Sequence, residues 1–386
     1  MKKDITFIYM DSAEKALYTP IAKEAEKRGY SVRMTQDKFA KCEIGFYCQH
    51  VNFPQFSKFS VIMLHDIIQQ YSNWPDLWLR EPWNKYDLGI LPSNVWEKNW
   101  NACSQFFYTR PKLGVYKIGW PKADVVAGLD KRAYKEAFQA EHGLDPSKKT
   151  VLYAPSWEND GKQDDFVQSM LKLDVNILIK QAAVDPNKFP DMAKAIDEMY
   201  LLHKDNTRVK ILDPKENIFN AILASDILVS EESSTMCEAI MMGIPSVSVS
   251  DWLIPDVVPS RYPQCNYEFV NMTTKAKLTE TDKEIIENYD GFAAEACKFR
   301  DETFSNIGNT SKMIMYIIDD CVNGKDIRYQ SLVPQKKQNL GLKKWAKHTF
   351  TKIHRELYEN YRVRSAVVRV LWNMAKTLKH ALIKKG

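Results

Sequence analysis

The chain has 386 residues, of which 45% are hydrophobic and 27% are charged, a balance that excludes a disordered protein and a single small module and favours two packed domains. Its net charge of +5 hides an asymmetry, because residues 335–386 carry 14 Lys or Arg against 2 acidic residues, whereas the first 334 residues carry 40 basic and 47 acidic ones. An acidic body with a basic tail is a poor partner for nucleic acid.

The sequence also argues against a secreted, zinc-binding or membrane-spanning chain. Its seven cysteines are odd in number and include no Cys-x-x-Cys pair, so we expect reduced thiols and neither a disulfide framework nor a zinc site. No uncharged apolar run approaches the roughly 20 residues of a membrane span, and the apolar stretch before Asp11 is too short for a signal peptide. We therefore expect a cytoplasmic protein.

The first third of the chain alternates between strand and helix patterns. Residues 5–9 form a short apolar run, residues 12–29 are rich in helix formers and end in a glycine, and residues 30–34 again resemble a strand. Further short apolar runs predict strands at residues 43–47, 60–64, 88–91 and 114–118. Buried strands separated by helices or loops predict a parallel sheet with crossover helices.

The pattern restarts after residues 130–149, which predict a helix and a turn. Apolar runs then predict strands at residues 150–153, 176–180, 208–212, 226–230 and 245–249. The fold class is therefore α/β, with two Rossmann-like domains that face a cleft. The predicted boundaries are an N-terminal domain at 1–128, a linker at 129–149, a C-terminal domain at 150–334 and a basic helical tail at 335–386.

The tail predicts a long helix or a helix pair, because residues 342–385 contain neither Gly nor Pro. Apolar side chains recur in it at helical spacing, with basic residues around them, at Val363, Val367, Val370, Leu371, Met374, Leu378, Ala381 and Leu382. Such a helix can lie on an anionic membrane, where each basic residue contributes on the order of 1 kcal/mol. Packing of the tail against the acidic body is the alternative.

Residues 226–247 are the segment most typical of a ligand site. A predicted buried strand ends at Ser230, three hydroxyl residues follow at Ser233, Ser234 and Thr235, and a helix then runs to Gly243. Free backbone N–H groups at the start of a helix, together with hydroxyl donors, favour an anion. The alternative is structural, with Ser234 as a simple helix cap.

These residues carry a family resemblance. Glu238-Ala-x-x-x-Gly243-x-Pro245 resembles the nucleotide-binding element of GT-B glycosyltransferases and UDP-GlcNAc 2-epimerases. The longer string from Asp226 to Ser234 is more similar to the CDP-glycerol glycerophosphotransferase family, the teichoic-acid primases and polymerases. The resemblance implies a GT-B fold.

Three other segments resemble motifs of the same family, in the same order. His65-Asp66, after the predicted strand 60–64, lies where the family has His-Gly. Gly119-Trp-Pro-Lys-Ala-Asp124 is similar to Gly-x-Pro-Arg-x-Asp, and residues 151–157, Val-Leu-Tyr-Ala-Pro-Ser-Trp, are similar to Tyr-Ala-Pro-Thr-Trp. The chain departs from the family at residues 180–183, Lys-Gln-Ala-Ala, where the family usually has Lys-x-His-Pro.

The resemblance implies a role for each matching residue. His65 is the expected general base, since a histidine can take a proton from a hydroxyl group at neutral pH, and Asp66 would orient its ring. The expected donor-phosphate ligands are Lys122, Lys180, Ser233, Ser234 and Thr235. The expected nucleotide and ribose contacts are Ala154, Pro155, Ser156, Trp157, Glu231 and Glu238. No Asp-x-Asp pair stands in a plausible metal position, so we expect neither a metal nor another cofactor.

The implied activity is transfer of glycerol phosphate, or a related alditol phosphate, from a CDP-linked donor to a hydroxyl group of a polyprenyl-linked or glycan acceptor, with release of CMP. The basic tail at 342–385 would hold the enzyme on the inner face of the plasma membrane. The alternatives are a GT-B glycosyltransferase of capsule or lipopolysaccharide synthesis, a UDP-GlcNAc 2-epimerase and a nucleotide-binding scaffold without turnover.

Overall fold

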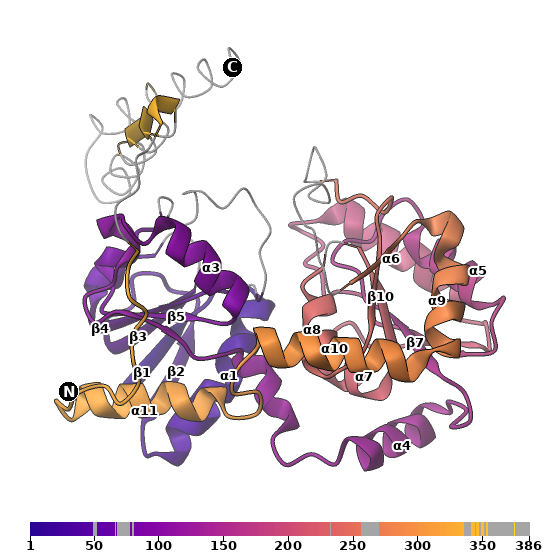
Figure 1. The fold of residues 1–386 in the computed structure, drawn as a ribbon, viewed down its shortest axis with the longest axis horizontal. Helices are drawn as coiled ribbons and strands as arrows, with labels where there is room; N and C mark the ends of the chain where they lie inside the picture. Colours follow the sequence, from indigo (N-terminus) through magenta and orange to yellow (C-terminus); the bar gives the residue numbers. More distant parts are fainter. Residues whose placement is uncertain are drawn as a thin grey trace.

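The computed structural model describes residues 1–48, 52–65, 67, 78, 81–231, 233–255, 270–335, 341–343, 345–346, 349–350, 353 and 374. Asp66 and most of the predicted tail helix lie outside these residues. Two α/β units lie side by side, one formed by the first third of the chain and the other by its middle (Figure 1). This confirms the predicted fold class. None of the described helices is long and apolar enough to cross a membrane.

The first unit is built on a sheet of six parallel strands in the order β2-β1-β3-β4-β5-β6. The strands are β1 (Asp4–Ile8), β2 (Ser31–Thr35), β3 (Cys42–Cys48), β4 (Ser57–Met63), β5 (Leu88–Leu91) and β6 (Val115–Lys117). Phe7 on β1 lies beside Phe46 on β3, and both rings are buried. The largely buried strands β1, β3, β4 and β5 are typical of a sheet covered on both faces.

Helices and 3-10 turns cover this sheet. They are α1 (Ser12–Lys27), η1 (Pro54–Phe56), η2 (Trp83–Lys85), α3 (Asn94–Cys103), η3 (Phe107–Thr109) and η4 (Pro121–Val126). Asp11 caps the start of α1 by accepting a hydrogen bond from the Glu14 N–H at 2.9 Å. Helix α1 ends before Gly29, whose φ of +78° lies in the left-handed region that glycine adopts without strain. Four tryptophans at or beside these elements, Trp78, Trp83, Trp96 and Trp100, belong to one buried apolar cluster.

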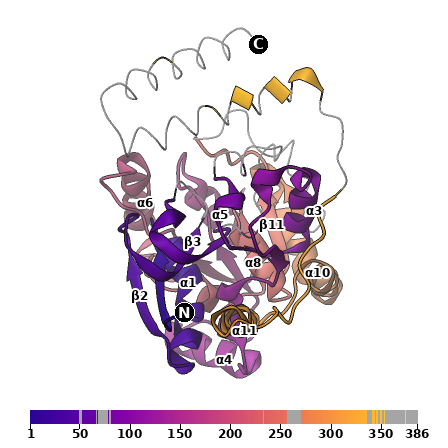
Figure 2. The ribbon, with the colours of Figure 1, turned by 90° about the vertical axis from the view of Figure 1, so that its left-hand side faces the viewer.

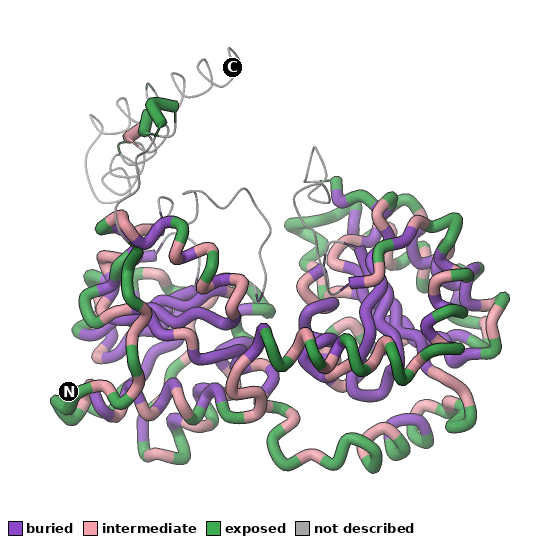
Figure 3. Tube along the Cα trace, in the orientation of Figure 1, coloured by how far each residue is buried: buried purple, intermediate pink, exposed green. Residues whose placement is uncertain are grey.

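The second unit also has six parallel strands, in the order β12-β11-β10-β7-β8-β9. They are β7 (Thr150–Tyr153), β8 (Asn176–Ile179), β9 (Val209–Ile211), β10 (Ile227–Ser230), β11 (Ser246–Val249) and β12 (Asn271–Thr273). The strand order reverses between β7 and β10, and ligands of such sheets bind beside the carboxyl ends of the strands at this reversal. Figure 3 shows buried strands in both units, enclosed by partly exposed helices.

The described helices that follow the first unit are α4 (Lys131–His142), α5 (Lys162–Met170), α6 (Pro190–His203), α7 (Ile218–Ala224), α8 (Thr235–Met241), α9 (Leu278–Glu287), α10 (Tyr289–Thr303) and α11 (Thr310–Val322), with η6 (Lys275–Lys277) before α9. Helix α4 links the two sheets and ends at Gly143 in the left-handed conformation. Both α4 and α11 lie along the lower side of the molecule in two views, α11 beneath the first unit and α4 beneath the second (Figures 1 and 2).

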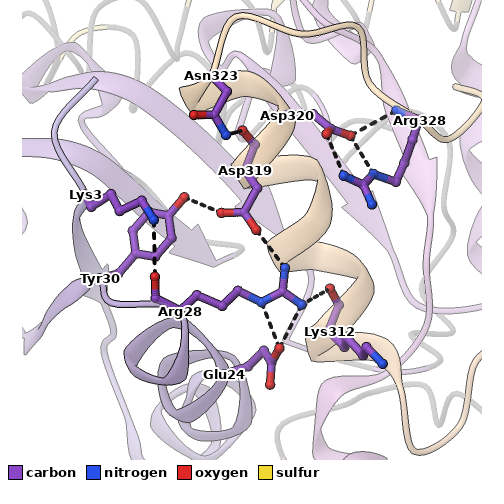
Figure 4. Close-up of polar contacts among 9 residues, drawn as sticks. All are labelled: Lys3, Glu24, Arg28, Tyr30, Lys312, Asp319, Asp320, Asn323 and Arg328. Atoms are coloured by element: carbon purple, nitrogen blue, oxygen red, sulfur yellow. Dashed lines mark hydrogen bonds and ion pairs between the residues drawn. The ribbon is translucent and has the colours of Figure 1, made fainter.

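The chain returns to the first unit after the second sheet is complete. Helix α11 packs against α1, where Arg28 forms a 2.7 Å ion pair with Asp319 and the Tyr30 hydroxyl donates to the same carboxylate at 2.7 Å (Figure 4). The guanidinium of Arg28 also pairs with Glu24 at 2.7 Å. We call Glu24, Arg28, Tyr30 and Asp319 the α1–α11 clamp. The predicted boundary at residue 334 groups α11 with the second unit, whereas these contacts join it to the first.

Candidate functional site

The reversal point of the second sheet brings together two of the segments predicted to bind the nucleotide. Strand β7 leads into the turn formed by residues 154–157, and β10 leads into Glu231 and α8. Ala154 is the meeting point, because its N–H donates to Val229 at 3.1 Å and its carbonyl accepts from Ser230 Oγ at 2.7 Å and Thr235 Oγ1 at 3.1 Å. The predicted nucleotide-binding segments are therefore neighbours in space.

Glu231 holds the turn in place. Its side chain is fully buried, and its Oε1 accepts hydrogen bonds from the Ser156 N–H at 2.8 Å, the Ser156 hydroxyl at 2.9 Å and the Trp157 N–H at 2.8 Å. Its Oε2 accepts from Ser230 Oγ at 3.0 Å. Both carboxylate oxygens thus bond within the second unit, where they fix the shape of the turn.

A second buried glutamate lies beyond the same turn, and sequence reasoning missed it. Glu158 is fully buried and accepts hydrogen bonds from the Tyr153 hydroxyl at 2.7 Å and from Gln181 Nε2 at 2.8 Å. Burial raises the pKa of Glu158 above its usual value, although the hydrogen bonds from Gln181 and Tyr153 oppose this shift. Lys162 donates to the Trp157 carbonyl at 2.9 Å. The signal in the sequence is the polar run that follows Trp157.

The hydroxyl residues before α8 are organised around Ser233. Ser233 is buried, and its Oγ accepts from the Thr235 N–H at 3.2 Å and from Thr235 Oγ1 at 2.9 Å. Ser234 occupies the cap position in a helical conformation, with φ −66° and ψ −17°, and its side chain makes no capping hydrogen bond. Ser234 is therefore the cap residue by position, as the alternative interpretation has it, but its half-buried hydroxyl makes no capping hydrogen bond.

Glu238, on α8, bonds across the junction between the two units. Only 1% of its side chain is exposed, and its Oε1 accepts from Lys122 Nζ at 2.7 Å and from the Trp120 indole N–H at 3.1 Å. Lys122 belongs to η4 of the first unit, and 17% of its side chain is exposed. The predicted ribose contact and a predicted phosphate ligand are therefore ion-paired with each other.

The segment that carries Lys122 is fixed by its two ends. Gly119 has a φ of +137°, and a Cβ atom there would lie 2.5 Å from the Ser305 carbonyl oxygen, so only glycine fits. Asp124 accepts hydrogen bonds from the backbone N–H groups of Thr310 at 2.9 Å and Ser311 at 2.6 Å, at the start of α11. The returning chain thus positions the segment that reaches the second unit.

Lys180 lies at the carboxyl end of β8 with 6% of its surface exposed. Its ammonium group donates to the carbonyls of Gln181 at 3.0 Å and Pro214 at 2.8 Å. Burial lowers the pKa of Lys180, and the positive charge of Lys122 lowers it further, whereas Glu216 and Asp213 raise it. The two lysines come from opposite units.

Two histidines complete the set of predicted groups. His65 follows β4 at the carboxyl edge of the first sheet and is half-buried. His203, the described histidine on α6, is buried with its Nε2 3.3 Å from Asp164 on α5. Burial lowers the pKa of His203 below its usual value. Within the described ranges, no three His, Cys, Asp or Glu residues lie close enough to hold a metal ion.

Comparisons with known proteins support the resemblance. The family model described as CDP-glycerol:poly(glycerophosphate) glycerophosphotransferase matches residues 68–250. Comparison with curated proteins gave no match. Among solved structures, the wall teichoic acid polymerase TagF is similar to this chain at 15% sequence identity, with a TM-score of 0.57, over 83% of this chain and 90% of that one.

Two epimerase structures have the same fold. A putative UDP-N-acetylglucosamine 2-epimerase from Listeria monocytogenes is 12% identical, with a TM-score of 0.59, over 86% of this chain and 100% of that one. The UDP-GlcNAc 2-epimerase of Neisseria meningitidis, bound to UDP-GlcNAc, is 14% identical, with a TM-score of 0.57, over 83% of this chain and 100% of that one. These likenesses confirm the predicted GT-B-like fold, and the family match distinguishes among its functions. Residues 68–250, a little under half of the chain, match this family model, and the match identifies a transferase similar to the CDP-glycerol:poly(glycerophosphate) glycerophosphotransferases.

Proposed function

We propose that this protein transfers glycerol phosphate, or a related alditol phosphate, from a CDP-linked donor to a hydroxyl group of a lipid-linked or glycan acceptor during synthesis of a cell-surface polymer. The observation that carries the proposal is the meeting of family motifs from both units at one place. The turn at 154–157 and the start of α8 lie together at the reversal of the second sheet, and Lys122 reaches Glu238 there from the first unit.

In the proposed reaction, the acceptor oxygen attacks the β-phosphorus of the donor. The bond between this phosphorus and the oxygen that bridges to the α-phosphate breaks, and CMP leaves with the electron pair. His65 takes the proton of the acceptor hydroxyl. Transfer of a phosphoryl group depends chiefly on positioning and on positive potential, which this chain can supply without covalent catalysis.

The donor contacts follow from the charges at the site. Lys122 and Lys180 face the diphosphate as cations, and Ser233, Ser234 and Thr235 offer hydroxyl groups. The carboxylate of Glu238 accepts hydrogen bonds from the ribose diol, and the turn at 154–157 shapes the pocket for the base. Since Glu231 already bonds to Ser156 and Trp157, we assign it to holding this turn instead of touching the nucleotide.

The acceptor and the site of action are part of the same proposal. A polyprenyl-linked acceptor lies at the inner face of the plasma membrane, and the basic tail at 342–385 would hold the enzyme there as a peripheral membrane protein. Liposome flotation with anionic and neutral vesicles tests this: binding to anionic vesicles that is lost on deletion of residues 342–386 supports it, and equal binding by both forms contradicts it.

The test of the activity is release of CMP from CDP-glycerol in the presence of a membrane acceptor fraction, with analysis of the glycerol phosphate added to the acceptor. We expect the wild-type protein to release CMP and His65→Ala to lose at least about 100-fold in rate. UDP-GlcNAc serves as the matched donor. Its conversion without an acceptor, with CDP-glycerol left intact, would contradict the proposal and favour an epimerase.

A further inference from the structure

The contact between Lys122 and Glu238 is made only by side chains of opposite units. One carboxylate oxygen accepts from both the Lys122 ammonium group, at 2.7 Å, and the Trp120 indole, at 3.1 Å. Glu238 is almost completely buried, whereas Lys122 retains some contact with water. Loss of the cation therefore leaves a buried carboxylate with an indole as its remaining donor in this contact, which is costly, while loss of the carboxylate leaves a cation that water can still reach.

The positive charge at this junction exceeds what Glu238 neutralises. The buried ammonium group of Lys180 is held by two backbone carbonyls, and the positive charge of Lys122 contributes to the lowered pKa of Lys180. When Glu238 is engaged elsewhere, the charge of Lys122 is no longer neutralised and adds to that of Lys180. An anion bound there offsets this excess of positive charge.

We propose that Lys122 and Glu238 exchange partners when the donor enters, so that this junction selects a ligand that offers a ribose diol to Glu238 and a diphosphate to Lys122 at the same time. This inference rests on the proposed function, and it makes the ion pair a specificity-determining device for conjugates of ribonucleoside diphosphates. A ligand that has a diphosphate but no ribose diol binds Lys122 and leaves the buried carboxylate of Glu238 without a new hydrogen-bond donor. The site therefore disfavours free pyrophosphate.

Calorimetric titration of the full-length protein with CDP, cytidine and pyrophosphate tests the exchange through the variant Glu238→Gln. The amide keeps the size of the side chain and removes the charge that holds Lys122. We expect pyrophosphate to bind this variant about tenfold more tightly than it binds the wild type, at the low end of what a close charge pair contributes, and CDP to bind it more weakly. A gain in affinity is an effect that a merely structural role would not produce.

Glu216→Gln is the matched control. Like Glu238→Gln it removes one carboxylate charge, but Glu216 acts on Lys180 and has no contact with Lys122 among the described residues. The exchange is overturned if pyrophosphate binds Glu238→Gln no better than the wild type, or if Glu216→Gln gives the same gain. Lys122→Gln provides an independent arm. It should weaken CDP about tenfold and leave cytidine unweakened, because Glu238 is then available to the diol. An equal loss for both ligands contradicts the exchange.

The same titrations separate this inference from the proposed function. If the wild type binds UDP instead of CDP and Glu238→Gln still gains affinity for pyrophosphate, the exchange holds and the cytidine donor is wrong. If CDP binds and the gain is absent, the donor holds and the exchange is wrong. If no nucleoside diphosphate binds, both are overturned.

Discussion

Glu231 and Glu238 are buried glutamates in the segment that follows β10, and they bond to different parts of the molecule. Both carboxylate oxygens of Glu231 accept hydrogen bonds from its own unit, from Ser156, Trp157 and Ser230. Two of these bonds come from the backbone N–H groups of Ser156 and Trp157. Glu238 bonds to two side chains of the other unit. Bonds within one unit persist when the units move apart, whereas bonds between side chains of two units need not.

The difference suggests a division of labour at the site. The turn at 154–157 is shaped before any ligand arrives, because the strands and Glu231 hold it. The contact of Lys122 with Glu238 is available for rearrangement, because Asp124 and Gly119 fix the backbone around Lys122 while its side chain remains partly exposed. A turn of fixed shape and an exchangeable contact would both suit the proposed reaction, in which a charged donor must be bound and released.

The largest expected effect comes from breaking the contact within the unit. Glu231→Ala removes four hydrogen bonds and leaves the N–H groups of Ser156 and Trp157 without this acceptor, so we expect the free energy of unfolding to fall by about 3 kcal/mol. Urea unfolding measures it. Glu231→Gln is the matched control and should lose less, because its amide oxygen can still accept. A loss below about 1 kcal/mol in the alanine variant would contradict the assigned role.

Breaking the ion pair between Lys122 and Glu238 should lower the free energy of unfolding by less than Glu231→Ala does. Lys122→Met leaves Glu238 buried without its cation, and we expect a loss of about 2 kcal/mol, reduced from the cost in a fully buried pair by the partial exposure of Lys122. A double-mutant cycle with Glu238→Gln should give a coupling free energy of about 1.5 kcal/mol. Additive losses would mean that the two side chains do not stabilise each other in solution.

The α1–α11 clamp calibrates both effects, since it joins distant parts of the chain outside the site. Asp319→Asn weakens the ion pair with Arg28 and the hydrogen bond from Tyr30, which lie at a partly exposed surface. We expect a loss of about 1 kcal/mol in urea unfolding and unchanged affinity for CDP in calorimetry. A change in CDP affinity would show that packing of α11 on the first unit affects nucleotide binding, and it would contradict our placing of the clamp outside the site.

The smallest expected effect is on the pH dependence of stability. It involves His203, which is buried in the second unit and bonds to neither Glu231 nor Glu238 in the contacts described above. Because burial lowers the pKa of folded His203, the unfolded chain binds the proton more readily. The stability due to neutral His203 is present above the usual histidine pKa and is lost as the pH falls through the lowered value. His203→Gln should therefore flatten the fall in stability between pH 7 and pH 5 by about 1 kcal/mol at most. An unchanged slope would contradict this.

Strand positions were predictable because fully buried parallel strands are short apolar runs. The predicted strands at 88–91 and 150–153 coincide with β5 and β7, and the one at 43–47 lies within β3. Strand β12, three residues long with a partly polar sequence, gave no such signal. The packing of α11 on α1 could not be predicted from the sequence either, because it depends on contacts between residues almost 300 positions apart, such as Arg28 and Asp319.

The sequence motifs could be recognised from the sequence, but the partners of their side chains could not be predicted. The motifs that contain Ala154, Lys122 and Glu238 stand out in the sequence, and the structure brings them to one place. The sequence shows two glutamates in one short segment but does not show that Glu231 bonds to a turn and Glu238 to a lysine. The partners of each glutamate depend on which groups the fold places beside its carboxylate. Glu158 escaped notice for the same reason, since its buried partner Gln181 belongs to another strand end.

The most direct test of the account is the shift in thermal unfolding midpoint of the wild-type protein with CDP-glycerol, CDP, UDP-GlcNAc and UDP, since a ligand that binds only the folded state raises this midpoint. The account predicts a rise with the two cytidine compounds that exceeds the rise with the uridine compounds and that becomes smaller in Ser234→Ala. A rise with uridine compounds alone would contradict the cytidine donor and would move the protein to the sugar-transferring or epimerase branch of the fold.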